Sequence, residues 1–148
     1  MTENPSLGRV LHLLADFRWD GAVDEPYKTE GDHFRHVRRV NLVGMHGENT
    51  DFHLRYFEVG EGGYTSREHH EHEHVIVVLR GEGDLLLGDT WRPLKFGDVA
   101  RVASGASHQL RNDFAEPFGF LCIVDARRDK PVVETATPSD PIDSLCGG

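Results

Sequence analysis

Short runs rich in apolar and β-branched residues recur along the middle of the chain, and turn-forming residues separate them. Their length and alternation are typical of β-strands. They span residues 37–43, 51–59, 75–80, 84–87, 91–94, 98–102, 108–111 and 118–124. Glycine-containing turns separate several of them. Closely spaced strands with only one candidate helix predict an all-β fold, an antiparallel barrel or jelly roll.

The two ends of the chain differ from this strand-rich middle. After Ser6, apolar residues at helical spacing predict a short N-terminal helix, and an extended arm is the alternative for so short a pattern. We therefore predict an N-terminal arm and loop at residues 1–36 and a barrel at residues 37–130. Residues 131–148, where prolines, serines and the terminal glycines gather, predict a flexible C-terminal tail.

Composition narrows the class of function. The 148 residues are the length of one domain with a substantial core. A formal net charge of -9 without any basic stripe argues against a nucleic-acid partner. The two cysteines, Cys122 and Cys146, are too few for a disulfide framework. Since there is also no signal-peptide pattern and no apolar run of about 20 residues, we expect a cytoplasmic protein without a membrane partner.

Residues 68–74 form an unbroken run of potential metal ligands, directly before a predicted strand. Imidazole and carboxylate together suit Mn, Fe, Ni, Cu or Zn better than Ca or Mg. On one straight strand His70 and His74 would lie ~13 Å apart at ~3.3 Å per residue, whereas metal–nitrogen bonds measure ~2.1 Å. We therefore predict a bend at residues 71–73, which lets Glu68 and His70 approach from one strand and His74 from the next.

A second cluster of glycine, histidine and asparagine follows with its own regular spacing, and the two clusters resemble the paired motifs of the cupin superfamily. The first motif, G-x5-H-x-H-x3,4-E-x6-G, is matched in register by Gly62, Glu68, His70, His74 and Gly81. The second, G-x5-P-x-G-x2-H-x3-N, is matched by Gly97, Ala103, Gly105, His108 and Asn112, with Ala103 in place of the usual proline. The resemblance implies a cupin barrel that holds a divalent metal.

The order of the ligands departs from the superfamily pattern of His, His, Glu, His. The predicted ligands are Glu68, His70, His74 and His108. The glutamate and one histidine are thus exchanged, while three histidines and one carboxylate are retained. Four such ligands leave about two positions of an octahedral ion open to substrate. In the alternative set His72 replaces Glu68 as a ligand. Glu68 then orients the imidazole of a ligand. His69 has the opposite strand parity and is expected to face outward.

Further stretches resemble a small bacterial monocupin group that includes a 1-methylthioxylulose 5-phosphate methylsulfurylase. They are residues 19–21, 54–59, 68–74, 81–83, 108–111, 118–126 and 128–131. The resemblance implies a Mn-dependent enzyme, with Fe, Ni or Zn as alternative metals. It also implies a small phosphorylated ketose as substrate, thiol-dependent C–S cleavage to deoxyxylulose 5-phosphate, a thiol such as glutathione, and a homodimer. An Fe- or Ni-dependent dioxygenase and a non-enzymatic module that binds a metal or small molecule remain alternatives.

Such chemistry needs a thiol and groups that bind an anion. Cys122, in a predicted strand, is either the catalytic thiol or a small buried hydrophobe. Arg55 and Arg111 each lie in a predicted strand near a motif, and they are candidates to bind the anion, with a structural ion pair as the alternative. Tyr56 and Gln109 are candidates for hydrogen bonds to the substrate.

Overall fold

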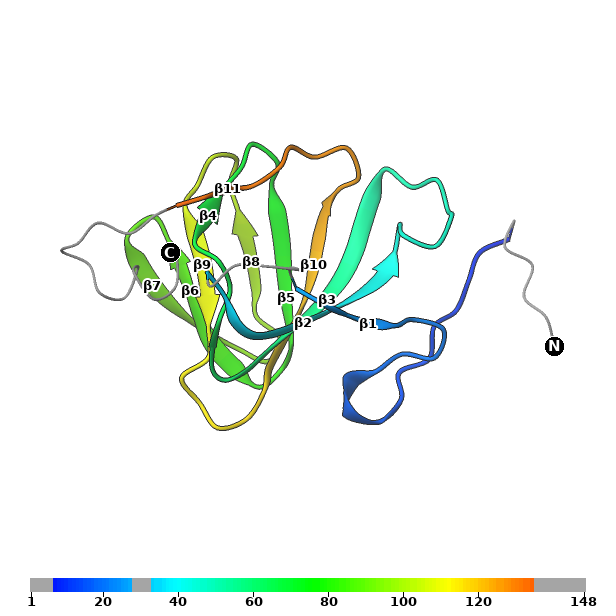
Figure 1. Ribbon diagram of the computed structural model, residues 1–148, viewed down its shortest axis with the longest axis horizontal. Helices are drawn as coiled ribbons and strands as arrows, with labels where there is room; N and C mark the ends of the chain where they lie inside the picture. Colours follow the sequence, from blue (N-terminus) through cyan, green and yellow to red (C-terminus); the bar gives the residue numbers. More distant parts are fainter. Residues whose placement is uncertain (1–6, 28–32, 135–148) are drawn as a thin grey trace.

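The structure, a computed structural model, describes residues 7–27 and 33–134. Within these ranges the chain forms eleven strands and one short 3-10 helix, Ala15–Phe17. The strands are β1 (Asp24–Pro26), β2 (Arg35–Val43), β3 (Phe52–Tyr64), β4 (Glu68–His69), β5 (His74–Arg80), β6 (Glu82–Leu87), β7 (Thr90–Lys95), β8 (Val99–Val102), β9 (His108–Arg111), β10 (Phe118–Asp125) and β11 (Val132–Val133). The antiparallel sheet curls round into a barrel, which confirms the predicted fold class (Figure 1). In these ranges no helix has the length and apolar character needed to cross a membrane.

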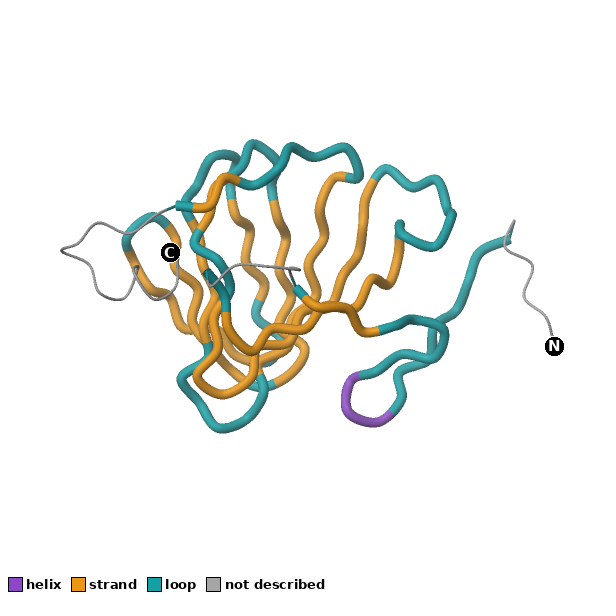
Figure 2. Tube along the Cα trace, viewed as in Figure 1, coloured by secondary structure: helices purple, strands orange, loops and turns teal. Residues whose placement is uncertain are grey.

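Pairing between distant parts of the chain closes the sheet. The strands follow the order β11-β4-β9-β3-β10-β5-β8, while β2 and β1 extend from β3, and β6 and β7 extend from β9. The eight predicted strands correspond to β2, β3 and β5 to β10. Sequence analysis missed β1, β4 and β11, which are two or three residues long (Figure 2). Of the predicted tail, Val132–Val133 pair with β4, and residues 135–148 lie outside the described ranges.

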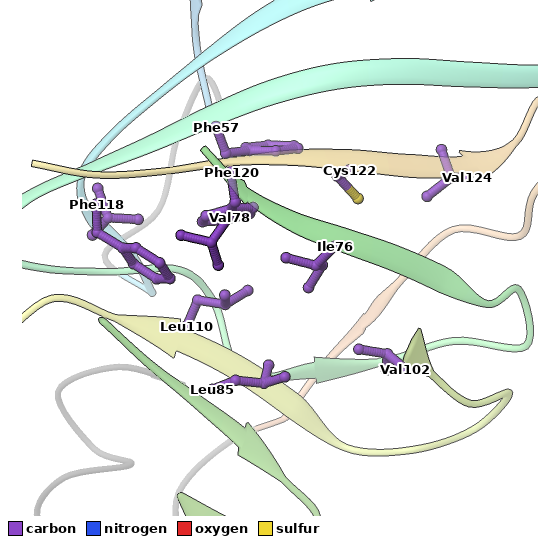
Figure 3. Packing of buried hydrophobic residues seen from close by; sticks show 11 residues of the cluster. Phe57, Ile76, Val78, Leu85, Val102, Leu110, Phe118, Phe120, Cys122 and Val124 are labelled. Carbon is purple, nitrogen blue, oxygen red and sulfur yellow. The ribbon is translucent and has the colours of Figure 1, made fainter. Parts of the chain in front are cut away.

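Apolar side chains from opposite walls of the barrel meet inside it (Figure 3). Phe57 and Val59 on β3 pair in register with Phe120 and Phe118 on β10. The rings of Phe57 and Phe120 stack with centroids 5.7 Å apart. Alternate residues of a strand face opposite sides, so the intervening residues of β3 point out of the barrel.

The outward side of β2 and β3 is covered by the N-terminal arm. Buried Tyr56 lies against Phe17 and Trp19 of the arm, with ring centroids 5.8 Å and 4.9 Å away. The described arm residues, 7–23, contain only the 3-10 turn and an isolated bridge between Leu13 and Trp19. The arm is therefore the alternative that the structure adopts, because Phe17 and Trp19 gain more from packing on the sheet than an isolated short helix provides.

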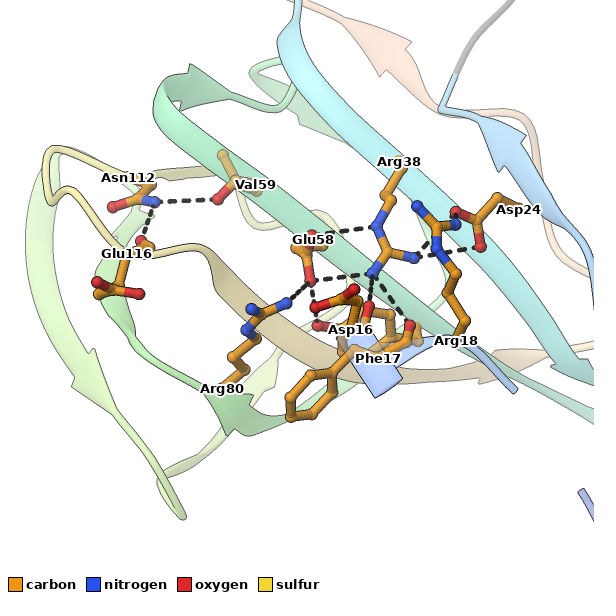
Figure 4. A network of polar contacts seen from close by, with 11 residues as sticks. Asp16, Phe17, Arg18, Asp24, Arg38, Glu58, Val59, Arg80, Asn112 and Glu116 are labelled. Atoms are coloured by element: carbon orange, nitrogen blue, oxygen red, sulfur yellow. Dashed lines mark hydrogen bonds and ion pairs between the residues drawn. The ribbon is translucent and has the colours of Figure 1, made fainter. Parts of the chain in front are cut away.

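A half-buried carboxylate links the arm to the sheet (Figure 4). Glu58 accepts hydrogen bonds from Tyr56 Oη at 2.9 Å, Arg38 Nη2 at 3.0 Å and Arg80 Nη1 at 2.7 Å. The same Nη2 of Arg38 donates to the backbone carbonyls of Asp16 and Phe17. Burial opposes ionisation of Glu58, but the hydrogen bonds from Arg38 and Tyr56 and the charge of Arg38 outweigh it, so the pKa of Glu58 is lowered.

We predict that ionised Glu58 contributes to the free energy of unfolding. Because its pKa is lowered in the folded state, the contribution is complete above the ordinary pKa of 4.5 and is lost as the pH falls through the folded value. Replacing Glu58 with Gln should lower the free energy of unfolding by about 1–3 kcal/mol at pH 7, measured by urea denaturation. The loss should shrink as the pH falls below 4.5. The exposed Glu61→Gln serves as the control, and an equal, pH-independent effect of both variants would contradict the prediction.

Candidate metal centre

The histidine run does not continue as one strand. Glu68 lies on β4, residues 70–73 leave the strand with a bend at 71–72, and His74 begins β5. The predicted bend is thus present. It brings His70 Nε2 and His74 Nε2 to 2.6 Å from each other, although a straight strand would separate these residues by ~13 Å.

The second sequence cluster brings His108 to the same place. His108 on β9 is the cross-strand partner of Glu68 on β4. Gly105, in the turn before β9, donates its backbone N–H to the carbonyl of His70 at 2.8 Å. Its φ of 76° is a left-handed conformation that glycine adopts without strain. Asn112 fixes the loop after β9, since its side-chain amide donates to the carbonyls of Val59 and Glu116.

The five potential ligands form two overlapping groups in which all donor atoms lie within 4.8 Å of one another. One group is His70, His72 and His74, and the other is Glu68, His70 and His108. Three members of the predicted set, Glu68, His70 and His108, form one group, and three members of the His72 alternative form the other. Neither set of four forms a single group, and His70 is common to both. His69 belongs to neither group, and its Nδ1 lies 3.1 Å from Glu134 at the surface.

Hydrogen bonds fix the orientation of the imidazoles. His70 Nδ1 lies 2.7 Å from the carbonyl of His72, and His108 Nδ1 lies 2.9 Å from the carbonyl of Ala106. A carbonyl can only accept, so both Nδ1 atoms carry hydrogen and both Nε2 atoms present lone pairs when the rings are neutral. This arrangement is typical of metal-binding histidines, whose other nitrogen donates to a carbonyl or carboxylate.

Burial favours the neutral rings that a metal requires. Burial, followed by the charge of neighbouring His108, lowers the pKa of His70 to about 4 and that of His74 to about 2. Burial also lowers the pKa of His108. His70 Nε2 presents a lone pair, so across the 2.6 Å gap it can either accept an N–H from His74 Nε2 or share a cation with it. The donor set of imidazoles and a carboxylate therefore fits a divalent transition metal.

Asp129 holds the bend from outside. Its carboxylate accepts hydrogen bonds from the backbone N–H groups of Glu71 and His72, at 2.9 Å and 3.0 Å, and from His72 Nδ1 at 2.7 Å. Bonds from the Glu71 amide and the His72 ring hold the pKa of Asp129 below its usual range. The ring of His72 stacks on that of His70, with centroids 3.7 Å apart. Sequence analysis missed Asp129 as a site residue, although the subfamily resemblance includes residues 128–131.

Four of the five potential ligands, Glu68, His72, His74 and His108, line a cavity of about 270 Å³ inside the barrel. Cys122 lies in its wall and is 2% exposed. Figure 3 shows its side chain among the buried hydrophobic residues of the barrel. Its Sγ is 3.0 Å from His74 Nδ1 and 3.6 Å from Arg55 Nη2. Burial raises the pKa of the Cys122 thiol, and the charge of Arg55 partly offsets this. The thiol is therefore a neighbour of the histidine cluster.

The predicted substrate-binding residues divide between the cavity and the scaffold. Arg55 lines the cavity, whereas Arg111, Tyr56 and Gln109 do not. Arg111 lies over the ring of Trp91 at 3.8 Å, Tyr56 faces the arm, and buried Gln109 donates to the carbonyl of Thr65. Each of these three side chains lies on the face of its strand that points away from the cavity.

Sequence analysis did not single out two further arginines that line the cavity. Arg39 on β2 and Arg128, after β10, line the cavity beside Arg55. Arg39 lies in a strand of mixed apolar and basic residues that contains no recognisable motif, so nothing in the sequence indicated that it would face the cavity. Arg128 follows the end of a predicted strand, where periodicity carries no information. The tertiary pairing of β2, β3 and β10 brings them together.

We predict that His70 is required in either ligand set. Removing it should weaken Mn²⁺ binding by more than about 100-fold. Losing a residue that only hydrogen-bonds a metal ligand typically weakens binding by about 10–100-fold. Titration calorimetry of metal-free His70→Ala and wild-type protein would measure this. The adjacent His69→Ala is the matched control and should bind like the wild type. Wild-type affinity in the His70 variant would contradict the assignment.

We also predict that Asp129 positions the ligand-bearing bend. The substitution Asp129→Asn removes the charged acceptor of two backbone amides and one ring nitrogen, so Mn²⁺ affinity should fall by about 10–100-fold. The exposed Asp113→Asn, whose carboxylate pairs with Arg111, should leave the affinity unchanged. Equal affinities for these two variants would show that the bend does not depend on Asp129.

Comparison with known proteins agrees with this architecture. Residues 55–124 match the cupin domain family Cupin_2. Over 122 residues the chain is 38% identical to the 1-methylthio-D-xylulose 5-phosphate methylsulfurylase of Rhodospirillum rubrum, covering 82% of this chain and 77% of that protein.

Two crystal structures of related barrels superpose on the whole domain. A cupin 2 conserved barrel domain protein from Rhodopseudomonas palustris is 37% identical with a TM-score of 0.78, covering 86% of this chain and 88% of that one. A cupin-2 domain from Rhodospirillum rubrum is 32% identical with a TM-score of 0.74, covering 90% and 95%. The motif spacing, the barrel and these matches together show that the chain belongs to the cupin family.

Proposed function

We propose that this chain is a metal-dependent enzyme that removes the methylthio group from 1-methylthioxylulose 5-phosphate with the help of a thiol, giving deoxyxylulose 5-phosphate. The observation that carries the proposal is that potential metal ligands, a buried thiol and three arginines line one cavity. The name of the Rhodospirillum rubrum relative supplies the substrate. The proposed metal is Mn²⁺, with the reducing cytoplasm as the compartment that provides the thiol.

The metal would be held by His70 together with members of the two groups that share it. When bound, a divalent ion supplies a Lewis acid that stabilises negative charge on the oxygen of a ketone. The chain itself orients the imidazoles through the carbonyls of His72 and Ala106. Apolar residues of the barrel interior below the site, including Ile76 and Phe120, limit the access of water.

Cys122 is the proposed attacking thiol. A bond forms between its sulfur and the methylthio sulfur, while the bond between that sulfur and C1 of the substrate breaks. The electron pair of the broken bond remains on the carbon chain as an enolate, and a proton, balancing the one lost by the thiol, adds to C1 to give the methyl ketone. The carbon is reduced, and the two sulfurs are oxidised to a mixed disulfide.

A second thiol restores Cys122. A thiol such as glutathione attacks the methylthio sulfur of the mixed disulfide and displaces the sulfur of Cys122. The methylthio group leaves as the mixed disulfide of the second thiol, so the overall reaction consumes one thiol for each substrate. His74 Nδ1 and Arg55, both in contact with Cys122 Sγ, are placed to stabilise the sulfur when it carries negative charge.

A homodimer is proposed from the family resemblance.

Mn²⁺-loaded protein incubated with 1-methylthioxylulose 5-phosphate and glutathione tests this function. We expect loss of substrate with formation of deoxyxylulose 5-phosphate in equal amount, measured by mass spectrometry. The His108→Ala and Cys122→Ser variants should lose this activity, because the first lacks a potential metal ligand and the second a sulfur nucleophile. No loss of substrate above the His108→Ala control would refute the proposal. Oxygen uptake in place of thiol consumption would identify a dioxygenase instead.

A further inference from the structure

Three guanidinium groups from separate parts of the chain line the cavity on one side of Cys122. Arg39 comes from β2, Arg55 from β3 and Arg128 from the segment after β10. Arg55 pairs in register with Cys122 on β10, and Arg39 pairs in register with Phe57, two residues further along β3. The positive charges of Arg55 and Arg39 act on Arg128, whose pKa is lowered by burial and by these two neighbours.

Two of these three guanidinium groups, Arg55 and Arg128, form no ion pair with the residues that the structure describes, although buried Glu68 lines the same cavity. Arg55 is 9% exposed and forms no ion pair within the described residues, and its buried Nε has no hydrogen-bond partner there. Arg39 Nη2 lies 3.2 Å from Glu25 Oε2, but the Asn41 amide also bonds that oxygen, and the buried Arg39 Nε is likewise unpaired in this part of the chain. Buried cations are usually paired, so a cavity that holds Arg55 and Arg128 without a described ion pair, and Arg39 with a shared one, indicates an anionic ligand.

Arg128 is held in place without being neutralised. Its Nη1 donates to His53 Nδ1 at 2.8 Å and to the carbonyl of Asp125 at 3.0 Å. Both acceptors are uncharged, because burial and the charges of Arg128 and Arg55 lower the pKa of His53. Arg128 therefore keeps its full positive charge, and its other N–H groups remain available to a ligand.

We propose that Arg39, Arg55 and Arg128 form a subsite for the phosphate group of a phosphosugar. The inference rests on the proposed function, since it names the part of the site that holds the phosphate of that substrate. A phosphate dianion offers several acceptor oxygens to the planar donors of arginine and matches more than one guanidinium charge, which a single carboxylate does not. Cys122 Sγ contacts both Arg55 and His74, so a sugar anchored by its phosphate at Arg55 would have the thiol and the histidines within reach.

Binding of the proposed product tests the subsite without requiring turnover. Titration calorimetry would compare 1-deoxyxylulose 5-phosphate with unphosphorylated 1-deoxyxylulose on the Mn²⁺-loaded full chain. We expect the phosphate to tighten binding by at least about 10-fold, and Arg39→Gln and Arg128→Gln each to weaken binding of the phosphorylated sugar by about 10–100-fold. Neither variant should change the binding of the unphosphorylated sugar.

The matched control is Arg127→Gln, next to Arg128 in the chain. The side chain of Arg127 is 83% exposed and its only described ion pair, with Asp51, is at the surface, so this variant should bind like the wild type. Equal binding of the two sugars by the wild type would overturn the subsite, as would equal affinities of the Arg127 and Arg128 variants.

The two proposals fail in different ways. Arginine-dependent binding of the phosphosugar without any turnover would support the subsite and refute the proposed reaction. Turnover with the same KM for phosphorylated and unphosphorylated substrates would support the reaction and refute the subsite. The wild-type comparison of the two sugars needs no substitution, so it decides the question even if an arginine variant does not fold.

Discussion

The site depends on the bend of the chain within residues 70–73. Two groups from elsewhere in the chain hold this bend: the backbone N–H of Gly105 donates to the carbonyl of His70, and the Asp129 carboxylate accepts from two backbone amides of the bend. The bend places the Nε2 atoms of His70 and His74 2.6 Å apart. The fold thus holds donor atoms from both sides of the bend close enough together to bind one cation.

The barrel interior changes from polar to apolar along two paired strands. Arg55, Phe57 and Val59 on β3 lie opposite Cys122, Phe120 and Phe118 on β10. The side chains that point into the barrel along these two strands are therefore Arg55 and Cys122 at the end near the histidines, and aromatic and apolar residues at the other end. The core positions the strands, and the same pairing that builds it carries the reactive groups to the cavity.

Sequence reasoning was most accurate where the chemistry is local. The closely spaced strands predicted the barrel, and the spacing of Gly62 to Gly81 and of Gly97 to Asn112 carried the resemblance to the cupin superfamily. The reach of a metal–nitrogen bond predicted the bend at residues 71–73. Strands shorter than four residues, such as β4 and β11, carry no periodicity of their own and exist because a partner strand supplies hydrogen bonds. Of the two arginines singled out from the sequence as anion binders, Arg55 lines the cavity and Arg111 does not.

By itself the sequence determined the fold class, the inventory of nitrogen, carboxylate and sulfur donors, and the alternation of side chains along each strand. Only the tertiary structure decided which side of each strand faces the cavity, which placed Cys122 beside His74 and directed Tyr56 to the arm. It also brought Arg39 and Arg128 next to Arg55 and gathered the ligands into two groups that share His70. The physical reason is that alternation is a local property of a strand, whereas the meeting of donors from distant strands depends on how the sheet pairs and closes.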